Sequence, residues 1–159
     1  MLLSPSYRDE LPCDNAVFHL TTACLVDPSS ELTECAEQSL SFVRGLDRGS
    51  TAVALGTQSS GPTVLGRRML DGWVAQWACI RSAPGQEYLL LLYGCRGLGD
   101  RCAMHGRSAE WADVIDSHGR LVTGGRNGFD IRPLERLGLD APLKAGVTAH
   151  DVGPNAMKP

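Results

Sequence analysis

Two apolar stretches joined by a short turn constrain the fold of this chain most. Residues 73–80 read Trp-Val-Ala-Gln-Trp-Ala-Cys-Ile, and residues 88–95 read Tyr-Leu-Leu-Leu-Leu-Tyr-Gly-Cys. Side chains alternate between the two faces of a strand. One face then carries Trp73, Ala75, Trp77 and Cys79, and the other carries Val74, Ala78 and Ile80. Since both faces are largely apolar and Pro84-Gly85 favours a turn, the pattern predicts a central hairpin buried on both sides.

A helix over residues 64–80 is the rival interpretation. It rests on the four-residue spacing of Leu65, Met69, Trp73 and Trp77. Two glycines inside the segment and its aromatic and β-branched content disfavour a helix. We therefore expect a strand.

The rest of the chain reads as short strands separated by turns. Strands are expected at 16–26, 51–55, 63–65, 111–115 and 121–123, the last two joined by a turn at 116–119. Residues 109–115 also fit a short helix. Residues 31–44 fit either a helix or a strand paired with 16–26, and we favour the strand.

These elements predict a mainly β fold. We expect a single compact antiparallel β domain, a sandwich or an open barrel, over residues 13–143, with an irregular C-terminal segment. A helix at about 31–44 would make the fold α+β. Residues 1–12 are expected to be a mobile lead-in, and residues 144–159 an extended or disordered tail.

Length and charge exclude several classes of protein. A chain of 159 residues with 43% hydrophobic residues suffices for one domain with its own core. The net charge of −3 and the scattered basic residues argue against nucleic-acid binding. The longest apolar run, residues 88–93, is far below the roughly 20 residues that cross a bilayer as a helix.

Six cysteines are many for this length, and they include no CxxC pair. They are Cys13, Cys24, Cys35, Cys79, Cys95 and Cys102. An even number without such a pair favours disulfides over zinc, and therefore an oxidising compartment. Fifteen pairings are possible. We expect Cys95 with Cys102 around a Gly-rich loop and Cys24 with Cys35 across the turn at 27–30, which leaves Cys13 with Cys79. Buried free thiols in a cytosolic protein are the alternative.

No motif predicts catalysis, a metal or a cofactor. Cys102 with His105 or His118 is the one pair to consider for a cysteine nucleophile, and a bridged Cys102 would exclude it. Thr57-Gln-Ser-Ser-Gly61 lacks the first glycine of a serine-hydrolase turn. Asp113 and Asp116 are expected at a solvated edge with Glu110. The Gly-rich segments 94–99 and 124–128 precede no helix that could bind phosphate, and the four histidines share no ligand spacing.

Two polar loops point to binding instead. The first is Gln58-Ser-Ser-Gly-Pro62, and the second runs from Arg96 to Arg107 beside the expected Cys95–Cys102 bridge. A tethered loop loses little entropy on binding. The candidate contact residues are Gln58, Ser59, Ser60, Arg96, Asp100, Arg101, His105 and Arg107.

The segments at 73–79, 88–95, 110–111 and 116–119 resemble small exported immunity proteins of bacteria. These are periplasmic antidotes to the peptidoglycan amidase effectors of type VI secretion. The resemblance covers residues 13–124 and includes no diagnostic motif, so it transfers no functional residue. It implies a non-enzymatic inhibitor that blocks a toxin, with Ser59 and Ser60 as a plug in the Cys-His cleft and the arginine loop as a second contact.

The sequence therefore predicts an exported protein-binding domain, periplasmic or secreted, whose export signal is not present in this chain. The expected partner is a protein toxin, in a 1:1 or a homodimeric 2:2 complex. Two other functions stay open. One is a small envelope hydrolase that uses Cys102 or a serine of residues 57–61, and the other is a glycan-binding envelope component that uses exposed aromatic residues such as Trp111.

Overall fold

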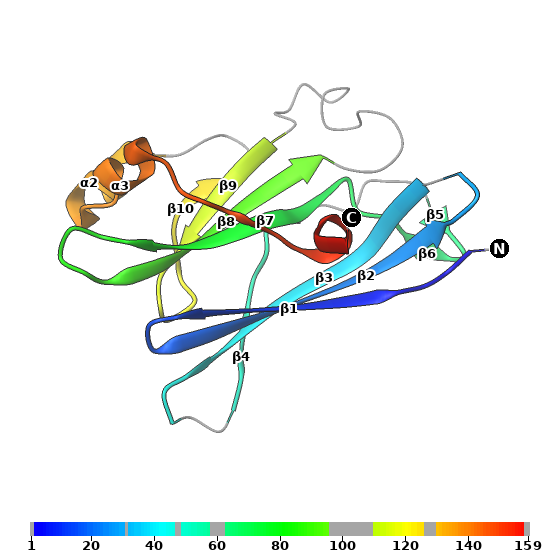
Figure 1. Cartoon of the computed structure of the whole chain (residues 1–159), viewed down its shortest axis with the longest axis horizontal. Helices are drawn as coiled ribbons and strands as arrows, with labels where there is room; N and C mark the ends of the chain where they lie inside the picture. Colours follow the sequence, from blue (N-terminus) through cyan, green and yellow to red (C-terminus); the bar gives the residue numbers. More distant parts are fainter. Residues whose placement is uncertain are drawn as a thin grey trace.

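The computed structural model describes residues 2–30, 32–46, 49–57, 63–95, 110–125 and 130–157. Two antiparallel sheets lie face to face (Figure 1). The first sheet has the order β1 (Ser6–Cys13), β2 (Ala16–Asp27), β3 (Leu32–Arg44), β4 (Thr51–Val53). The second has the order β10 (Leu121–Gly125), β9 (Glu110–Ile115), β8 (Glu87–Cys95), β7 (Gly72–Arg81), β11 (His150–Asp151). The fold is therefore mainly β, a sandwich and not a closed barrel, as predicted.

Short elements complete the described chain. A small hairpin joins β5 (Thr63–Val64) to β6 (Arg67–Arg68). The helices α2 (Ile131–Leu137) and α3 (Asp140–Ala145) lie at one end of the molecule in Figure 1, and the 3-10 turn η1 (Gly153–Met157) follows β11. Residues 32–44 form β3, so the helix considered at 31–44 is wrong, and residues 110–115 are also a strand.

The predicted central hairpin is confirmed. β7 pairs with β8 from Gly72 opposite Cys95 to Arg81 opposite Glu87, around the turn that contains Pro84 and Gly85. One face of this hairpin packs in the core between the sheets, and the other packs under the two helices. The inner core includes Phe18, Leu20, Leu40, Phe42, Val74, Trp77, Leu89 and Leu91. The outer cluster contains Ile80, Tyr88, Leu90, Val114, Leu134 and Leu139.

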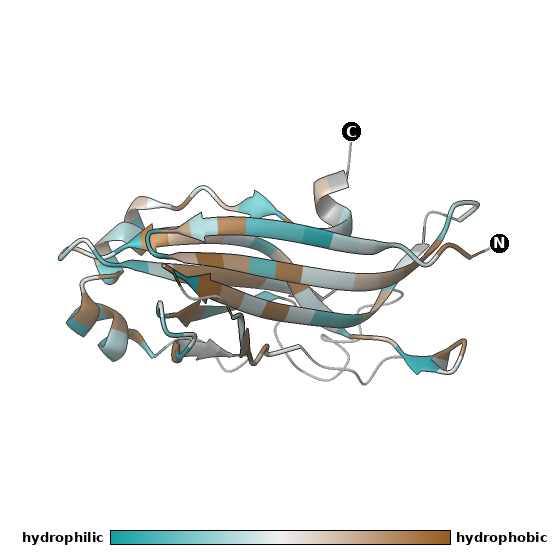
Figure 2. Cartoon of the chain, turned by 90° about the horizontal axis from the view of Figure 1, so that it is seen from below, coloured by the Kyte–Doolittle hydropathy of each residue, from teal (hydrophilic) through white to brown (hydrophobic). Residues whose placement is uncertain are grey.

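The hydropathy of the sheets matches this layering. Figure 2 shows alternating brown and teal bands along the long strands of the first sheet. Along β2, Ala16, Phe18 and Leu20 are buried, while the residues between them are half-buried. One face of this sheet thus packs against the core and the other meets solvent.

A bulge in β7 changes the expected faces. The pairing of β7 with β8 shifts between Val74 and Gln76, so Ala75 has no opposite residue on β8. An extra residue reverses the alternation on one side of the bulge. Val74 therefore belongs to the same inner core as Trp77, and its expected position on the opposite face is wrong. Trp73 packs instead with Leu70 and the Cys24–Cys35 pair.

Described segments near both ends of the chain pair with strands of the sandwich. Strand β1 pairs in register with β2, and it includes residues 6–12, which were expected to belong to a mobile lead-in. Proline has no backbone N–H, and Pro12 is tolerated because, in the described sheet, one side of the edge strand β1 has no neighbouring strand to which it must donate hydrogen bonds. At the other end, β11 pairs with β7, the side chain of Val152 is buried, and the Gly153 N–H donates to the Asp9 carboxylate at 2.9 Å.

The two short helices span 131–137 and 140–145. Irregular structure was expected up to about residue 143, and an extended or disordered tail after it. The Asp130 side chain accepts a hydrogen bond from the Arg132 N–H, and Gly138 ends α2 in the left-handed conformation. These are a standard N-cap and C-cap. Leu134 and Leu139 then cover the outer face of the central hairpin.

Two of the three expected disulfides are confirmed. Cys13 is bonded to Cys79, which joins β1 to β7, and Cys24 is bonded to Cys35, which joins β2 to β3. The third pair lies outside the described residues because it includes Cys102. Disulfides are typical of an oxidising, non-cytoplasmic environment. Within the described part of the chain, no helix is long and apolar enough to span a membrane.

Candidate functional site

All eight predicted contact residues lie outside the described part of the chain. They are Gln58, Ser59, Ser60, Arg96, Asp100, Arg101, His105 and Arg107. The structure instead defines the positions from which their segments leave the sandwich.

Those positions are neighbours at one end of the second sheet. Gly94 at the end of β8 pairs with Glu110 at the start of β9, and Gly125 at the end of β10 pairs with Ala112. The chain before residue 58 reaches the same place, since the Gly56 N–H donates to the Tyr93 hydroxyl at 2.9 Å. We call this region the loop end, because segments 58–62, 96–109 and 126–129 all join the sandwich there.

A buried polar pair supports the loop end. The side chains of Tyr93 and Asp113 are 2% and 5% exposed and hydrogen-bonded to each other. Burial, followed by the negative charge of Asp113, raises the pKa of the Tyr93 hydroxyl far above its usual value of 10.0. Tyr93 therefore stays protonated and connects Gly56 to β9. Asp113 was expected at a solvated edge, and this expectation is wrong.

Trp111 packs beside this pair. Its ring stacks on Tyr93 with centroids 5.2 Å apart, and its side chain is 7% exposed. A β-carbon on Gly72 would lie 2.3 Å from the Trp111 ring, so Gly72 makes room for it. Since Trp111 is buried, it does not provide the exposed aromatic surface that glycan binding was expected to use.

The β5–β6 hairpin directly follows residues 58–62. Leu65 and Gly66 form its two-residue turn, with φ of 51° and 77°. A leucine in this left-handed region is strained, by about 1–2 kcal/mol relative to the right-handed conformation. The Leu65 side chain is 74% exposed and gains little from packing. Arg67 and Arg68 follow it and are exposed too.

This hairpin is fixed to the sandwich at its base. The Arg67 guanidinium lies 3.6 Å from the Glu37 carboxylate on β3, and the Leu70 N–H donates to the Cys35 carbonyl at 2.7 Å. Met69, Leu70 and Asp71 are buried. The chain then enters β7 at Gly72, opposite Cys95, so the hairpin belongs to the loop end. Leu65 and Arg67 were not predicted as site residues, because Leu-Gly is not one of the preferred pairs of a two-residue hairpin turn and Gly66 was the one local signal.

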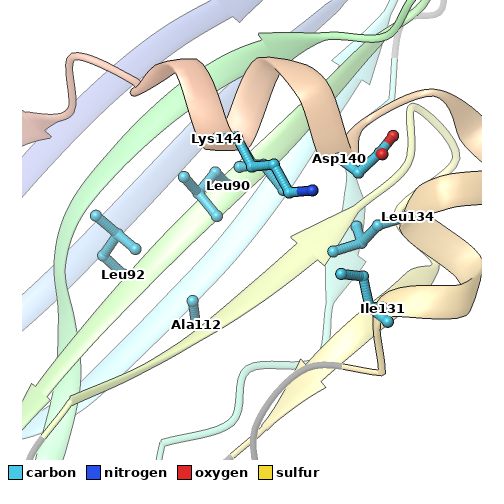
Figure 3. A pocket seen from close by; sticks show the side chains of 8 residues that line it. Leu90, Leu92, Ala112, Ile131, Leu134, Asp140 and Lys144 are labelled. Carbon is cyan, nitrogen blue, oxygen red and sulfur yellow. The ribbon is translucent and has the colours of Figure 1, made fainter.

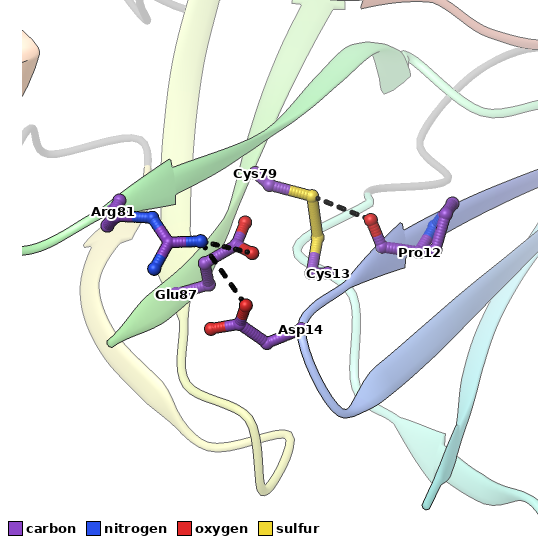
Figure 4. The surroundings of a disulfide bond; sticks show 6 residues. All are labelled: Pro12, Cys13, Asp14, Cys79, Arg81 and Glu87. Carbon is purple, nitrogen blue, oxygen red and sulfur yellow. Dashed lines mark hydrogen bonds and ion pairs between the residues drawn. A yellow bond between two sulfur atoms is a disulfide. The ribbon is translucent and has the colours of Figure 1, made fainter. Parts of the chain in front are cut away.

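A second polar cluster surrounds the Cys13–Cys79 bond at the other end of β7 (Figure 4). Arg81 forms ion pairs with Asp14 at 3.3 Å and with Glu87 at 3.2 Å. Burial raises the pKa of Glu87, and the neighbouring Asp14 carboxylate raises it further. Cys13, Cys79 and Glu87 also bring three potential metal-ligand atoms within 4.8 Å of one another. The two sulfur atoms are bonded to each other and offer no thiolate, so this cluster is structural.

The described residues form none of the expected catalytic pairs. Cys102 and His105 lie outside them, and His118 is an exposed residue of the β9–β10 turn. Its N–H donates to the Asp116 carboxylate at 2.9 Å, as does that of Arg120, so Asp116 stabilises the turn. Of the candidate serine loop, only Thr57 is described.

One further feature is an apolar cavity of about 450 Å³ between α2, α3 and the outer face of the second sheet. It is lined by Leu90, Leu92, Ala112, Ile131, Leu134, Asp140, Leu143 and Lys144. The sequence analysis missed it because it forms between elements that are far apart along the chain.

Comparisons of the chain with protein-family models, with curated proteins and with solved structures find no significant match.

Proposed function

We propose that this chain is a non-enzymatic protein-binding domain of an oxidising compartment, and that the loop end is its contact surface. One observation carries the proposal: Leu65 is held exposed and strained at the tip of an anchored hairpin. Strain of this kind is concentrated at binding and functional sites. The side chain would regain free energy by entering an apolar pocket of a partner.

The positively charged residues beside Leu65 also support a contact surface for a protein partner. Arg67 and Arg68 stand beside Leu65, and arginine is enriched among the residues that contribute most to protein interfaces. Four of the eight candidate contact residues, predicted from the sequence, are also arginine or histidine residues of segment 96–109. The partner is therefore expected to present an apolar pocket with acidic residues around it.

The proposed partner is a toxin that degrades the cell wall, in keeping with the resemblance to immunity proteins of peptidoglycan amidase effectors. Ser59 and Ser60 would enter the active-site cleft, the arginine loop would make the second contact, and Leu65 would dock beside the serines. The proposed location is the periplasm, and the proposed complex is 1:1 or 2:2.

The test uses purified protein and a panel of type VI peptidoglycan amidases. We expect stoichiometric inhibition of peptidoglycan cleavage by one of them, a stable complex on size-exclusion chromatography, and no turnover by this protein alone. Leu65→Asn places the preferred Asn-Gly pair in the turn, so the fold is preserved while the apolar contact is lost. We expect about tenfold weaker binding.

Leu46→Asn is the matched control, because Leu46 is fully exposed in the turn that follows β3, at the other end of that strand from the loop end. It should leave binding unchanged. If Leu65→Asn and Leu46→Asn weaken binding of the toxin equally, the loop end is not the contact surface. If the whole panel fails to bind while the protein is retained by peptidoglycan or cleaves it, the proposal is wrong.

A further inference from the structure

The cavity under α2 and α3 has the properties of a small-molecule site. Its volume of about 450 Å³ lies within the range typical of such sites. Six of its eight lining residues are leucine, isoleucine or alanine. These six belong to the strands β8 and β9 and to the helices α2 and α3. The two helices have seven and six residues, which is too short to cover the whole outer face of β8 and β9.

Several of the lining side chains remain accessible. Leu92, Ala112 and Leu143 are only half-buried, and Ile131 is 49% exposed. Leu90 and Leu134, in contrast, are almost fully buried at the base. The cavity therefore has a closed apolar floor and an open side, through which an elongated apolar group can enter.

The charged residues of the cavity indicate which polar group a bound ligand would carry. Asp140 and Lys144 lie one turn apart on α3. Figure 3 shows the Lys144 side chain extended toward the same side as the apolar side chains that line the cavity, and the Asp140 carboxylate turned away from them. Lys144 forms no ion pair within the residues that the structure describes. An exposed ammonium beside an apolar floor suits a carboxylate that carries an apolar tail.

We propose that this cavity binds a fatty acid of medium length, with the acyl chain against Leu90, Leu92 and Ala112 and the carboxylate at Lys144. The site lies on the outer face of the second sheet and is separate from the loop end. Binding of a fatty acid in this cavity does not depend on the protein-binding function proposed above.

The probes are decanoate and decanol, which share one chain length and differ in charge. Calorimetric titrations below the micelle concentration of decanoate and the solubility limit of decanol should show binding of both, with decanoate about tenfold tighter because it contacts the ammonium. Lys144→Gln should remove this difference and leave decanol binding unchanged. Arg136→Gln removes a cation from the last turn of α2 that does not line the cavity, and it should have no effect.

A second pair of variants tests the cavity itself. Ala112→Phe should abolish binding of both probes because the ring fills the cavity. Ile131→Trp is the alternative from the helix side, at a partly exposed position where folding is not at risk. The proposal is overturned if the wild-type protein binds neither probe, if both filled variants still bind, or if Arg136→Gln and Lys144→Gln weaken decanoate equally.

Discussion

The Gln38 side chain forms two hydrogen bonds with the backbone of Val74. The Val74 N–H donates to Gln38 Oε1 at 2.8 Å, and Gln38 Nε2 donates to the Val74 carbonyl at 3.0 Å. Gln38 belongs to β3 in the first sheet, whereas Val74 lies at the bulge of β7 in the second. Val74 lies opposite Tyr93 of β8, but β11 on the other side of β7 pairs only with Gln76 and Trp77. The Gln38 side-chain amide thus bonds to both polar backbone groups of Val74 from the first sheet, and it also donates to the Thr22 hydroxyl at 3.1 Å.

Gln38→Leu should destabilise the protein by about 2 kcal/mol, because it leaves the Val74 N–H and carbonyl unsatisfied. Chemical denaturation measures the change. Gln76→Leu is the matched control, since Gln76 makes only an exposed hydrogen bond with Asp151, and it should cost less than about 1 kcal/mol. If the two variants lose the same free energy of unfolding, the hydrogen bonds between Gln38 and Val74 do not contribute more than an exposed hydrogen bond.

The two disulfides should contribute unequally to stability. Cys13 and Cys79 are 66 residues apart, and Cys24 and Cys35 are 11 apart. The loss of loop entropy in the unfolded chain predicts about 4 kcal/mol for the first bond and about 3 kcal/mol for the second. Replacement of each pair by alanine, followed by denaturant titration, tests the order. A larger loss for Cys24 and Cys35 would contradict it.

Tyr93→Phe should destabilise the protein by about 1–3 kcal/mol, since the Gly56 N–H and the buried Asp113 carboxylate both lose a partner. Tyr88→Phe is the control, because the Tyr88 hydroxyl makes a long 3.4 Å hydrogen bond with Gln86 that is expected to contribute little. In an alkaline titration followed by tyrosinate absorbance, Tyr93 should ionise only when the protein unfolds. Its ionisation in the folded state would contradict the raised pKa.

Glu87 should make stability depend on pH. Its pKa is raised above the ordinary value of 4.5, mainly by burial, so the fold favours the protonated form. The stabilisation from the protonated Glu87 carboxyl is fully present below pH 4.5, and it is lost as pH rises through the folded-state pKa of Glu87. Glu87→Gln stays neutral, so its stability relative to the wild type should rise between about pH 4 and pH 7. A falling trend for Glu87→Gln would reverse the sign of the shift.

Leu65→Asn should fold at least as stably as the wild type. Asparagine tolerates the left-handed conformation better than leucine does, and the exposed Leu65 side chain makes little packing contact to lose. A thermal melt of the free protein checks this directly. A lower melting temperature would mean that Leu65 packs in solution, which would also remove the main argument for the loop end as a contact surface.

Much of the fold could be predicted because its signals are local. The apolar residues of 73–80 and 88–95 are close in the chain and share one turn, so they indicate a buried hairpin without further information. The Cys24–Cys35 bond also joins neighbouring strands across a short turn. Strand β1 was missed because prolines and charges obscured its alternation, and the helix α2 was missed because seven residues are too few for a periodic pattern. The caps Asp130 and Gly138 were the available signals for that helix.

The sequence alone determined the β class, the central hairpin and the oxidising environment, since these depend on alternation, turn residues and cysteine number. Only the tertiary structure decided the bulge in β7, the burial of Trp111 and Asp113, and the cavity below α3. The physical reason is separation along the chain. Gln38 and Val74 are 36 residues apart, and Ala112 and Lys144 line the same cavity from a strand and a helix, so no local pattern records these arrangements. They form only when the sheets and helices pack.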